Sequence, residues 1–277
     1  MDIIHEKMKP GVFSPGIYDC YTNAEYHAHE AVSKSDLDLI HKSPAHYKGA
    51  KHVETPAMKL GTAVHSLVLE PAKFAATYCL IDGDRRTKAV KDEVKAAESA
   101  GKVVCTREEL DQYAAMAEQV TRSKIGAALL KDSIREHSVF AEIDGVHVKC
   151  RPDGFNERLG GMLFDLKTTK DASPQGFAQS VGRYRYYVQD AFYRHVLSAV
   201  TGADADDYSF VFIAVESTPP YAVAFYQLDE MAALQGWVEA RDDMRRYRDA
   251  QTSGKWSGYS PKIESLSLPR WAVITTE

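Results

Sequence analysis

The stretch "HVKCRPDGFNERLGGMLFDLKTT", residues 147–169, joins short apolar runs to three charged residues, Asp153, Asp165 and Lys167. It opens with the composition of a strand, and Pro152 breaks the ladder of that strand where a turn begins. A second strand follows the Gly-Gly pair. We expect this meander to bring the end of the first strand beside the second, so that two carboxylates and one ammonium group converge.

Side chains alternate along the second of these strands, expected at 162–168 with the sequence MLFDLKT. Every second residue of a strand lies on one face. Phe164 and Leu166 are therefore expected to face a core, and Asp165 and Lys167 to point together to the other side. A surface ion pair on an exposed sheet is the simpler interpretation, but the common facing of the charges favours a functional site.

The remainder of the chain alternates between helical and strand-like patterns. Asp144-Gly145 between two apolar runs is a strong hairpin signal. Strands are expected on both sides of this turn within 138–152, and at 162–168, 208–216 and 221–228. Helices are expected at 33–44 and 55–71, in the later part of 82–102 after a basic loop, at 107–130 as one or two helices, at 173–202 as one long helix, and at 229–250. This order predicts an α/β (α+β mixed) fold, with one central mixed β-sheet flanked by helices on both faces.

The composition limits the classes of protein to consider. The 277 residues have a net charge of −5, which argues against a basic coat for nucleic acid but leaves room for a local basic groove. No run approaches the roughly 18 apolar residues of a membrane span, and the N-terminus lacks the pattern of a signal peptide. A cytoplasmic protein without membrane contact is expected. Reduced thiols are expected for the scattered cysteines, which are Cys20, Cys79, Cys105 and Cys150.

The side chains at 153, 165 and 167 fit the hydrolysis of a phosphodiester. Hard divalent cations bind carboxylate oxygens, and hydrolysis needs an activated water and neutralisation of the departing oxygen. Lys167 is able to orient that water, to stabilise the scissile phosphate, or to act as a base if its pKa is lowered. The sequence leaves these three roles open.

His65 stands in the segment GTAVHSLVLEP of the second expected helix. A core histidine with satisfied hydrogen bonds is the simpler interpretation. Alternatively, its neutral imidazole supplies a further metal ligand, which Mn²⁺ accepts more readily than Mg²⁺. Glu70, at the end of this helix, is expected to be a capping or surface charge.

The long helix expected at 173–202 contains several polar and aromatic residues. Gln189 and Tyr193 are four positions apart and so share a face, which Arg183 and Tyr186 extend toward the N-terminus. The amide and the hydroxyl could hold a phosphate or a catalytic side chain. Aromatic packing is an equally simple account of the tyrosines.

Two further groups are candidates for contact with DNA or phosphate. Ser33, Lys34 and Ser35 at a helix start offer backbone N–H groups and a helix dipole to an anion, although an ordinary N-cap is the simpler interpretation. Arg86 and Lys88 belong to a basic loop that could follow a DNA backbone. A solvated loop is the alternative.

With these residues assembled, the chain resembles the PD-(D/E)xK nuclease superfamily, and within it the RecE (exonuclease VIII) type of phage recombination exonuclease. The resemblance runs over most of the chain, in the segments "EYHAHEAVSKSDLDLIHKSPAHYKG", "GTAVHSLVLEP", "VHVKCRPDG", "FDLKTT" and "YRYYVQDAFYR". It implies particular roles: metal binding by His65, Asp153, Asp165 and the Leu166 carbonyl, assistance to the water by Lys167, and a motif behind the site that contains Gln189 and Tyr193.

The resemblance also implies an activity and partners. The expected enzyme is a 5′→3′ exonuclease that needs Mg²⁺, with Mn²⁺ able to substitute and two ions per site. It digests one strand of linear double-stranded DNA and leaves a 3′ single-stranded tail for a RecT-type annealing protein. A homo-oligomeric ring, trimer or tetramer, and a phage- or prophage-encoded protein in the cytoplasm of a bacterial host are implied as well.

One nuclease domain is expected over residues 1–277. Its expected parts are an N-terminal arm at 1–30, a mainly helical part at 31–135, the catalytic sheet and helices at 136–250, and an irregular tail at 251–277. Two other functions stay open: an endonuclease of the repair or restriction type, and a catalytically silent module that binds DNA ends. Whether Glu142 reaches the metals is also open.

Overall fold

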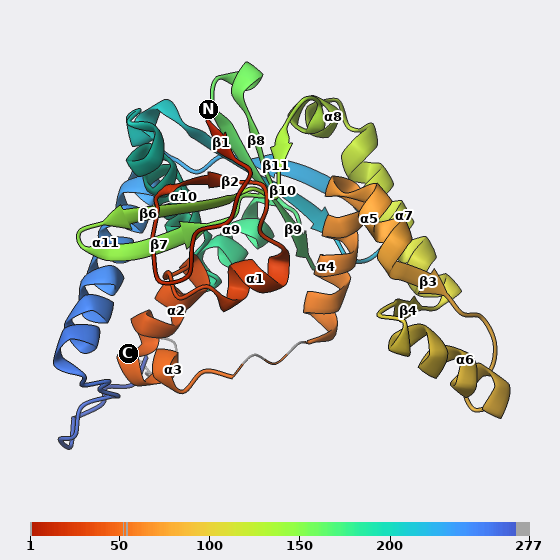
Figure 1. The fold of residues 1–277 in the computed structure, drawn as a ribbon, viewed down its shortest axis with the longest axis horizontal. Coiled ribbons are helices and arrows are strands. Elements are labelled where there is room, and N and C mark those ends of the chain that lie inside the picture. The colour runs from red at the N-terminus through yellow and green to blue at the C-terminus, as the bar shows by residue number, and fades with distance from the viewer. Residues whose placement is uncertain (1, 52, 54, 270–277) are drawn as a thin grey trace, which may run out of the picture.

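The computed structural model describes residues 2–51, 53 and 55–269. A five-stranded sheet lies at its centre, in the order β11-β10-β9-β8-β5 (Figure 1). Its strands are β5 (Ile134–Arg135), β8 (Gly154–Asn156), β9 (Met162–Thr169), β10 (Ser209–Glu216) and β11 (Val223–Tyr226). β9 and β10 are parallel, and the other pairs are antiparallel. The mixed sheet that the sequence predicts is therefore confirmed.

A second sheet of four strands, in the order β1-β2-β6-β7, contains the predicted hairpin. Its strands are β1 (Ile3–Ile4), β2 (Gly16–Tyr18), β6 (Ser138–Ile143) and β7 (Val146–Cys150). The prediction of a single sheet was wrong, because β7 and β9 belong to different sheets. The chain changes sheet at Pro152, which has no N–H to continue the ladder, and β8 begins at Gly154 directly afterwards.

Glycine at position 154 permits the close approach of β8 to β9. A Cβ atom there would lie 2.0 Å from a ring carbon of Phe164, well inside van der Waals contact. β8 pairs with β9 only from Met162 to Phe164. The backbone edge of β9 beyond Phe164 is therefore open to side chains on this side of the strand.

Helices surround the sheets. The first eight are α1 (Asn23–Ala28), α2 (Lys34–Lys42), α3 (Pro44–Lys48), α4 (Pro56–Leu69), α5 (Pro71–Thr77), α6 (Lys88–Ser99), α7 (Arg107–Arg122) and α8 (Lys124–Leu130). The last three are α9 (Pro174–Arg183), α10 (Tyr186–Thr201) and α11 (Glu230–Ser253). In the described part of the chain, none of them is long and apolar enough to cross a membrane.

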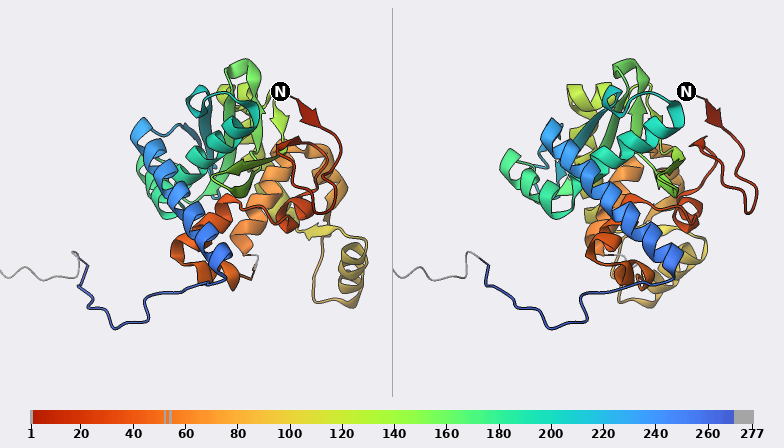
Figure 2. Two further views of the ribbon diagram at one scale, coloured as in Figure 1. Left: turned by 60° about the vertical axis from the view of Figure 1, so that its left-hand side comes forward. Right: turned by 90° about the vertical axis from the view of Figure 1, so that its left-hand side faces the viewer.

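Two segments extend away from the body. The parallel pair of β3 (Tyr78–Leu80) and β4 (Val103–Cys105) leads to α6, which projects outward (Figures 1 and 2). After α11 the chain continues without helix or strand to residue 269, as predicted for the tail, and residues 270–277 lie outside the described residues. The N-terminal arm differs from the prediction, because it contributes two strands and a helix. The four cysteines are free thiols, as expected.

Two apolar layers sandwich the five-stranded sheet. On one face Phe164 and Leu166 of β9 pack with Val64 of α4 and Met116 of α7. On the other face Leu163 packs with residues of α9, α10 and the second sheet. Neighbouring residues of β9 thus face opposite layers, as its alternation predicts. Asp165 and Lys167 share the face of Leu163, which α10 covers.

The long helix predicted at 173–202 is broken into α9 and α10. Arg185 adopts a left-handed conformation with φ of 52°, which costs an L-residue roughly 1–2 kcal/mol. Its guanidinium compensates by contacting three carboxylates, which are those of Asp38, Glu239 and Asp243. The break separates Arg183 from the face of Gln189, so the prediction that Arg183 extends that face was wrong.

Candidate active site

The open edge of β9 carries the first part of the site. Leu166 directs both of its backbone groups away from β10. Its N–H donates to Oδ2 of Asp153 at 2.6 Å, and its carbonyl lies 2.5 Å from Nε2 of His65. Asp153 precedes β8 and is only 7% exposed. The structure therefore brings the side chains of α4 and of the turn before β8 to the same residue of β9.

His65 lies between two acceptors rather than in a purely apolar core. Its Nδ1 is 3.2 Å from Oδ2 of Asp153, while Nε2 faces the Leu166 carbonyl. Burial disfavours the imidazolium, but the Asp153 carboxylate and, to a smaller degree, Asp165 outweigh burial and raise the pKa of His65 to about 9. In the absence of an ion, a protonated imidazole thus bridges the two oxygens.

Asp165 and Lys167 form a second group, on the face of β9 that α10 covers. The Lys167 ammonium is 2.6 Å from Oδ2 of Asp165, and the side-chain amide of Gln189 in α10 donates to Oδ1. Burial and the nearby Asp153 carboxylate raise the pKa of Asp165, against the opposing effect of Lys167. For Lys167, burial lowers the pKa, but the charge of Asp165 prevails and the net shift is upward. Lys167 is therefore held as an ammonium ion.

Two aromatic residues of α10 flank this group. The ring of Tyr186 lies 4.7 Å from Nζ of Lys167. Tyr193, one turn beyond Gln189, packs with its ring centroid 5.9 Å from that of Phe210. Burial raises the pKa of Tyr193, and the Asp165 carboxylate adds to this rise. The predicted helix motif therefore lies beside the carboxylates, with Gln189 in direct contact.

Glu136 is a member of the site that the sequence analysis missed. Ligand atoms of His65, Glu136 and Asp153 all lie within 4.8 Å of one another. Burial, and then the Asp153 carboxylate, raise the pKa of Glu136 to about 7, although Arg151 at 3.1 Å opposes this. The local sequence gives no signal for it, because Glu136 comes from the connection between β5 and β6 with φ of 56°. Glu142, which the sequence left open, is exposed and lies 3.7 Å from His147 instead.

The donor set fits a hard divalent cation. Three carboxylates, an imidazole and one backbone carbonyl are gathered at buried or half-buried positions, and Mg²⁺ and Mn²⁺ take oxygen ligands of this kind, with nitrogen better accepted by Mn²⁺. The residues that could hold the ion are His65, Glu136, Asp153, Asp165 and Leu166. Buried acidic groups in this number are costly without a compensating cation.

The predicted anion site at the start of α2 is occupied by contacts within the protein. The Ser33 hydroxyl caps α2 and forms a capping box with Asp36, as the simpler interpretation had it. Lys34 is mostly buried and donates to Oδ2 of Asp38 at 2.7 Å and to the Tyr184 carbonyl at 2.6 Å. Ser35 is exposed, and its hydroxyl lies 2.9 Å from the Ser33 hydroxyl. A phosphate at this helix start stays a prediction.

The other predicted phosphate-binding residues are exposed. Arg86 is paired with Asp84 within its own loop, and Lys88 begins α6, which projects from the body (Figure 1). Arg183 ends α9, with its guanidinium 5.7 Å from the ring centroid of Tyr184.

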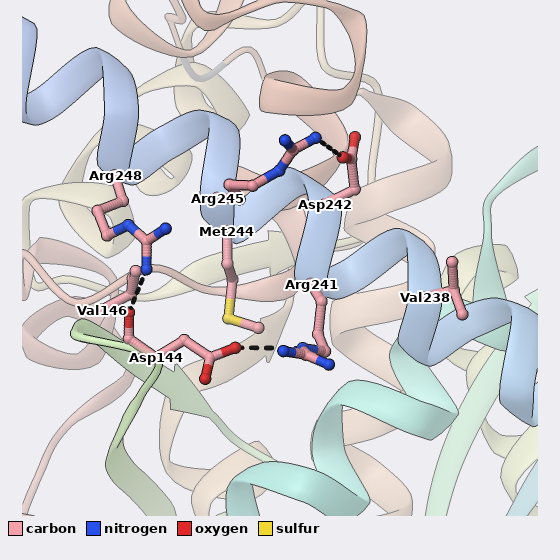
Figure 3. Close-up of a pocket in the computed structure, with 8 residues that line it drawn as sticks. All are labelled: Asp144, Val146, Val238, Arg241, Asp242, Met244, Arg245 and Arg248. Atoms are coloured by element: carbon pink, nitrogen blue, oxygen red, sulfur yellow. Dashed lines mark hydrogen bonds and ion pairs between the residues drawn. The ribbon is translucent and has the colours of Figure 1, made fainter.

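A separate arginine-rich pocket lies between the β6–β7 turn and α11 (Figure 3). Its volume is about 550 Å³. Arg241 pairs there with the Asp144 carboxylate, and Arg248 donates to the Asp144 carbonyl. None of the residues that line this pocket belongs to the carboxylate cluster of β9.

The fold and the cluster define the class of the protein. A mixed sheet whose central strand carries Asp165 and Lys167 beside a second buried aspartate, Asp153, is the arrangement of PD-(D/E)xK domains. The chain belongs to the family described as "PDDEXK-like domain of unknown function (DUF3799)", whose profile matches residues 33–269.

Comparison with solved structures agrees with this fold. A protein of Eubacterium rectale described as a "putative exonuclease" superposes with a TM-score of 0.62 at 14% identity, covering 86% of this chain and 88% of the other. The structure of SSO0001 gives a TM-score of only 0.29, with 15% identity and coverages of 76% and 82%, which is too low to indicate a shared fold. No curated protein matches the sequence significantly. The family and the fold together support a nuclease.

Proposed function

We propose that the protein is a metal-dependent nuclease that hydrolyses phosphodiester bonds of DNA at the cluster on β9. One observation carries the proposal. Asp153, Asp165 and Lys167 come from two separate segments and still meet around Leu166, together with His65 and Glu136. A structural ion pair would need neither the second aspartate nor the histidine.

Different residues of the site would bind the metal ion, contact the phosphate and orient the carboxylates. His65, Glu136, Asp153, Asp165 and the Leu166 carbonyl would hold the divalent cation, which supplies a Lewis acid for the phosphate and lowers the pKa of a water molecule. Lys167 keeps its proton, so we assign it to contact with a phosphate oxygen and to orientation of the water. Gln189 fixes Asp165 by donating to Oδ1. A fixed carboxylate keeps its orientation before substrate arrives.

The finer proposal is a 5′→3′ exonuclease of the RecE type that acts on one strand of linear duplex DNA with Mg²⁺, or with Mn²⁺ in its place, and with two ions per site. The order of the sequence motifs supports it, as does the "putative exonuclease" description of the Eubacterium rectale protein. A RecT-type annealing partner, a ring of three or four subunits and a phage origin in a bacterial cytoplasm belong to the same proposal. They rest on the resemblance alone.

Release of nucleotides from linear duplex DNA tests the proposal. Wild-type protein should release label from a 5′-labelled linear duplex in Mg²⁺ and leave covalently closed circular duplex intact. Lys167→Met should lose this activity, whereas Lys170→Met, an exposed lysine just after β9, serves as the matched control and should keep it. Nicking of the circle would favour an endonuclease. Binding of DNA ends without hydrolysis in either metal would favour a silent binding module.

A further inference from the structure

A column of aromatic rings leads from the core beside β9 to the surface. Phe212 of β10 is fully buried, and Tyr186 stacks on it with centroids 5.7 Å apart and planes 23° apart. Tyr184 stacks on Tyr186 in turn, at 5.6 Å and 27°. The outermost ring, that of Tyr184, is 51% exposed. The column therefore ends in an aromatic surface in contact with solvent.

This column passes the lysine of the candidate active site. Nζ of Lys167 lies 4.7 Å from the centroid of Tyr186, the ring on which Tyr184 stacks. A planar group that stacked on Tyr184 would therefore lie two stacking steps out from Tyr186, with Tyr184 between them. Such a group is within a few base spacings of a phosphate held at Lys167, because neighbouring bases of a strand are about 3.4 Å apart along the helix axis.

The backbone of Tyr184 is held rigidly in place. Its carbonyl accepts the buried Lys34 ammonium at 2.6 Å. The next residue is Arg185, whose left-handed backbone is fixed by ion pairs to Asp38 and Asp243. An exposed aromatic ring on such a support loses little conformational entropy when it binds a ligand. The inner face of this ring packs on Tyr186, whereas its exposed part is available to a ligand.

The charge beside the ring indicates the chemistry of that ligand. Arg183 is exposed, and its guanidinium lies over the Tyr184 ring, 5.7 Å from the centroid. A base that stacks on this face therefore moves the arginine side chain aside, toward the phosphate of the same nucleotide. An aromatic face with an adjacent cation suits a nucleotide, because the base stacks on the ring while the phosphate meets the guanidinium. Stacking needs a base with a free face, which is either a base that has left the duplex stack or the base at the very end of a strand.

We propose that Tyr184 is a stacking platform for a nucleobase of the DNA end within a few nucleotides of the scissile phosphate, with Arg183 as the phosphate contact of the same nucleotide. This proposal rests on the proposed function and assigns a substrate-binding residue to that site. For any nucleotide other than the terminal one, it implies that the DNA end is frayed before hydrolysis, because an inner base must leave the duplex stack in order to reach the ring. The platform is independent of base identity, since every base has a π-face.

The experiment compares Tyr184→Ala and Tyr184→Phe on linear duplexes that are intact or that carry an abasic site at each terminal nucleotide in turn. On intact DNA, Tyr184→Ala should lower kcat/KM about 10-fold, the expected loss of one base–aromatic stack, and Tyr184→Phe should stay close to wild type. At one abasic position, wild type should fall to the level of Tyr184→Ala, and the alanine variant should lose nothing further. Tyr259→Ala, which removes a 76% exposed tyrosine from the C-terminal tail, is the control and should resemble wild type.

Two results would overturn the platform. One is an unchanged kcat/KM for Tyr184→Ala on intact DNA. The other is a loss that remains equally large at every abasic position, which would indicate a structural effect. Binding of fluorescein-labelled duplex in Ca²⁺, followed by anisotropy, provides a second arm with the same variants and abasic positions. If wild type hydrolyses no DNA, the proposed function fails, while the binding arm still decides whether a base stacks on Tyr184.

Discussion

Replacement of Arg185 by methionine should destabilise the protein strongly. The Arg185 guanidinium is buried among carboxylates from α2 and α11, with N–O distances of 3.0 Å to Asp38, 3.0 Å to Glu239 and 2.6 Å to Asp243. Asp243 is fully buried, so the methionine variant leaves a buried charge with less compensation. Loss of one partner of a buried ion pair lowers the free energy of unfolding by about 3–5 kcal/mol. Arg246, 3.6 Å from Asp243, and His41, at 3.2 Å, offset a part of this loss.

The control is an arginine–aspartate pair of similar geometry at the surface. Arg241 of α11 lies 3.1 Å from Asp144, and both side chains are about half exposed. Arg241→Met should lower the free energy of unfolding by less than about 1 kcal/mol, because solvent screens the pair. Urea unfolding at pH 7, followed by circular dichroism, measures both variants. Equal losses of under 1 kcal/mol would refute the reasoning about the buried network.

The pH dependence of the Arg185→Met effect gives a second check. Burial raises the pKa of Asp243 above its ordinary value, and Arg185 opposes this rise. Without the arginine the folded-state pKa rises further. A carboxyl group with a raised folded-state pKa binds its proton more tightly in the folded than in the unfolded protein, so its contribution to stability is lost as pH increases. The destabilisation by Arg185→Met should therefore be smaller at pH 5 than at pH 7.

Three other sites give further predictions. Burial raises the pKa of Asp190 to about 6 despite its pair with Arg194. As the pH rises from about 4 to 7, the free energy of unfolding of the wild type should therefore fall by about 3 kcal/mol relative to that of Asp190→Asn, as urea unfolding measures. A difference between the two proteins that does not change with pH would contradict this. A Cβ at Gly236 would lie 2.1 Å from the Tyr187 carbonyl. Gly236→Ala should therefore push α11 away from α10 and lower the free energy of unfolding by about 1–3 kcal/mol. An unchanged midpoint of urea unfolding would contradict this. Because the pKa of His65 is about 9 and that of Glu136 about 7 without an ion, Mn²⁺ binding at pH 7 should release about one proton from His65 and about half a proton from Glu136. Titration calorimetry in buffers of different ionisation enthalpy measures this number. His65→Gln should lower the number of released protons by about one, and the same number in both proteins would exclude His65 as a source.

The strand pattern carried most of the predictable information about the site. Local alternation is enough to put Asp165 and Lys167 on one face of β9, because the two-residue period of a strand does not depend on the rest of the chain. The sequence also pointed to His65 and Gln189, and both contact the aspartates in the structure. Their catalytic roles stay predictions.

The features that were missed depend on tertiary contacts. The break between α9 and α10 arises at Arg185, whose left-handed backbone is stabilised by carboxylates far away in the sequence. Tyrosines on either side of it have no helix-breaking tendency that a local pattern would reveal. Glu136 joins the cluster only because the chain crosses between two sheets at this point. Pro152 did give a local signal, but a turn within one sheet and a change of sheet both fit it.

The short β8 strand has a consequence for how the site tolerates sequence change. Because β8 stops pairing at Phe164, Leu166 presents its own N–H and carbonyl to Asp153 and His65. Those two contacts belong to the main chain and are the same for any amino acid with an N–H. Valine, isoleucine or methionine at this position would alter packing alone, whereas proline would remove the donor to Asp153. Position 166 should therefore accept many apolar residues but not proline, because the site uses the backbone N–H and carbonyl of this residue.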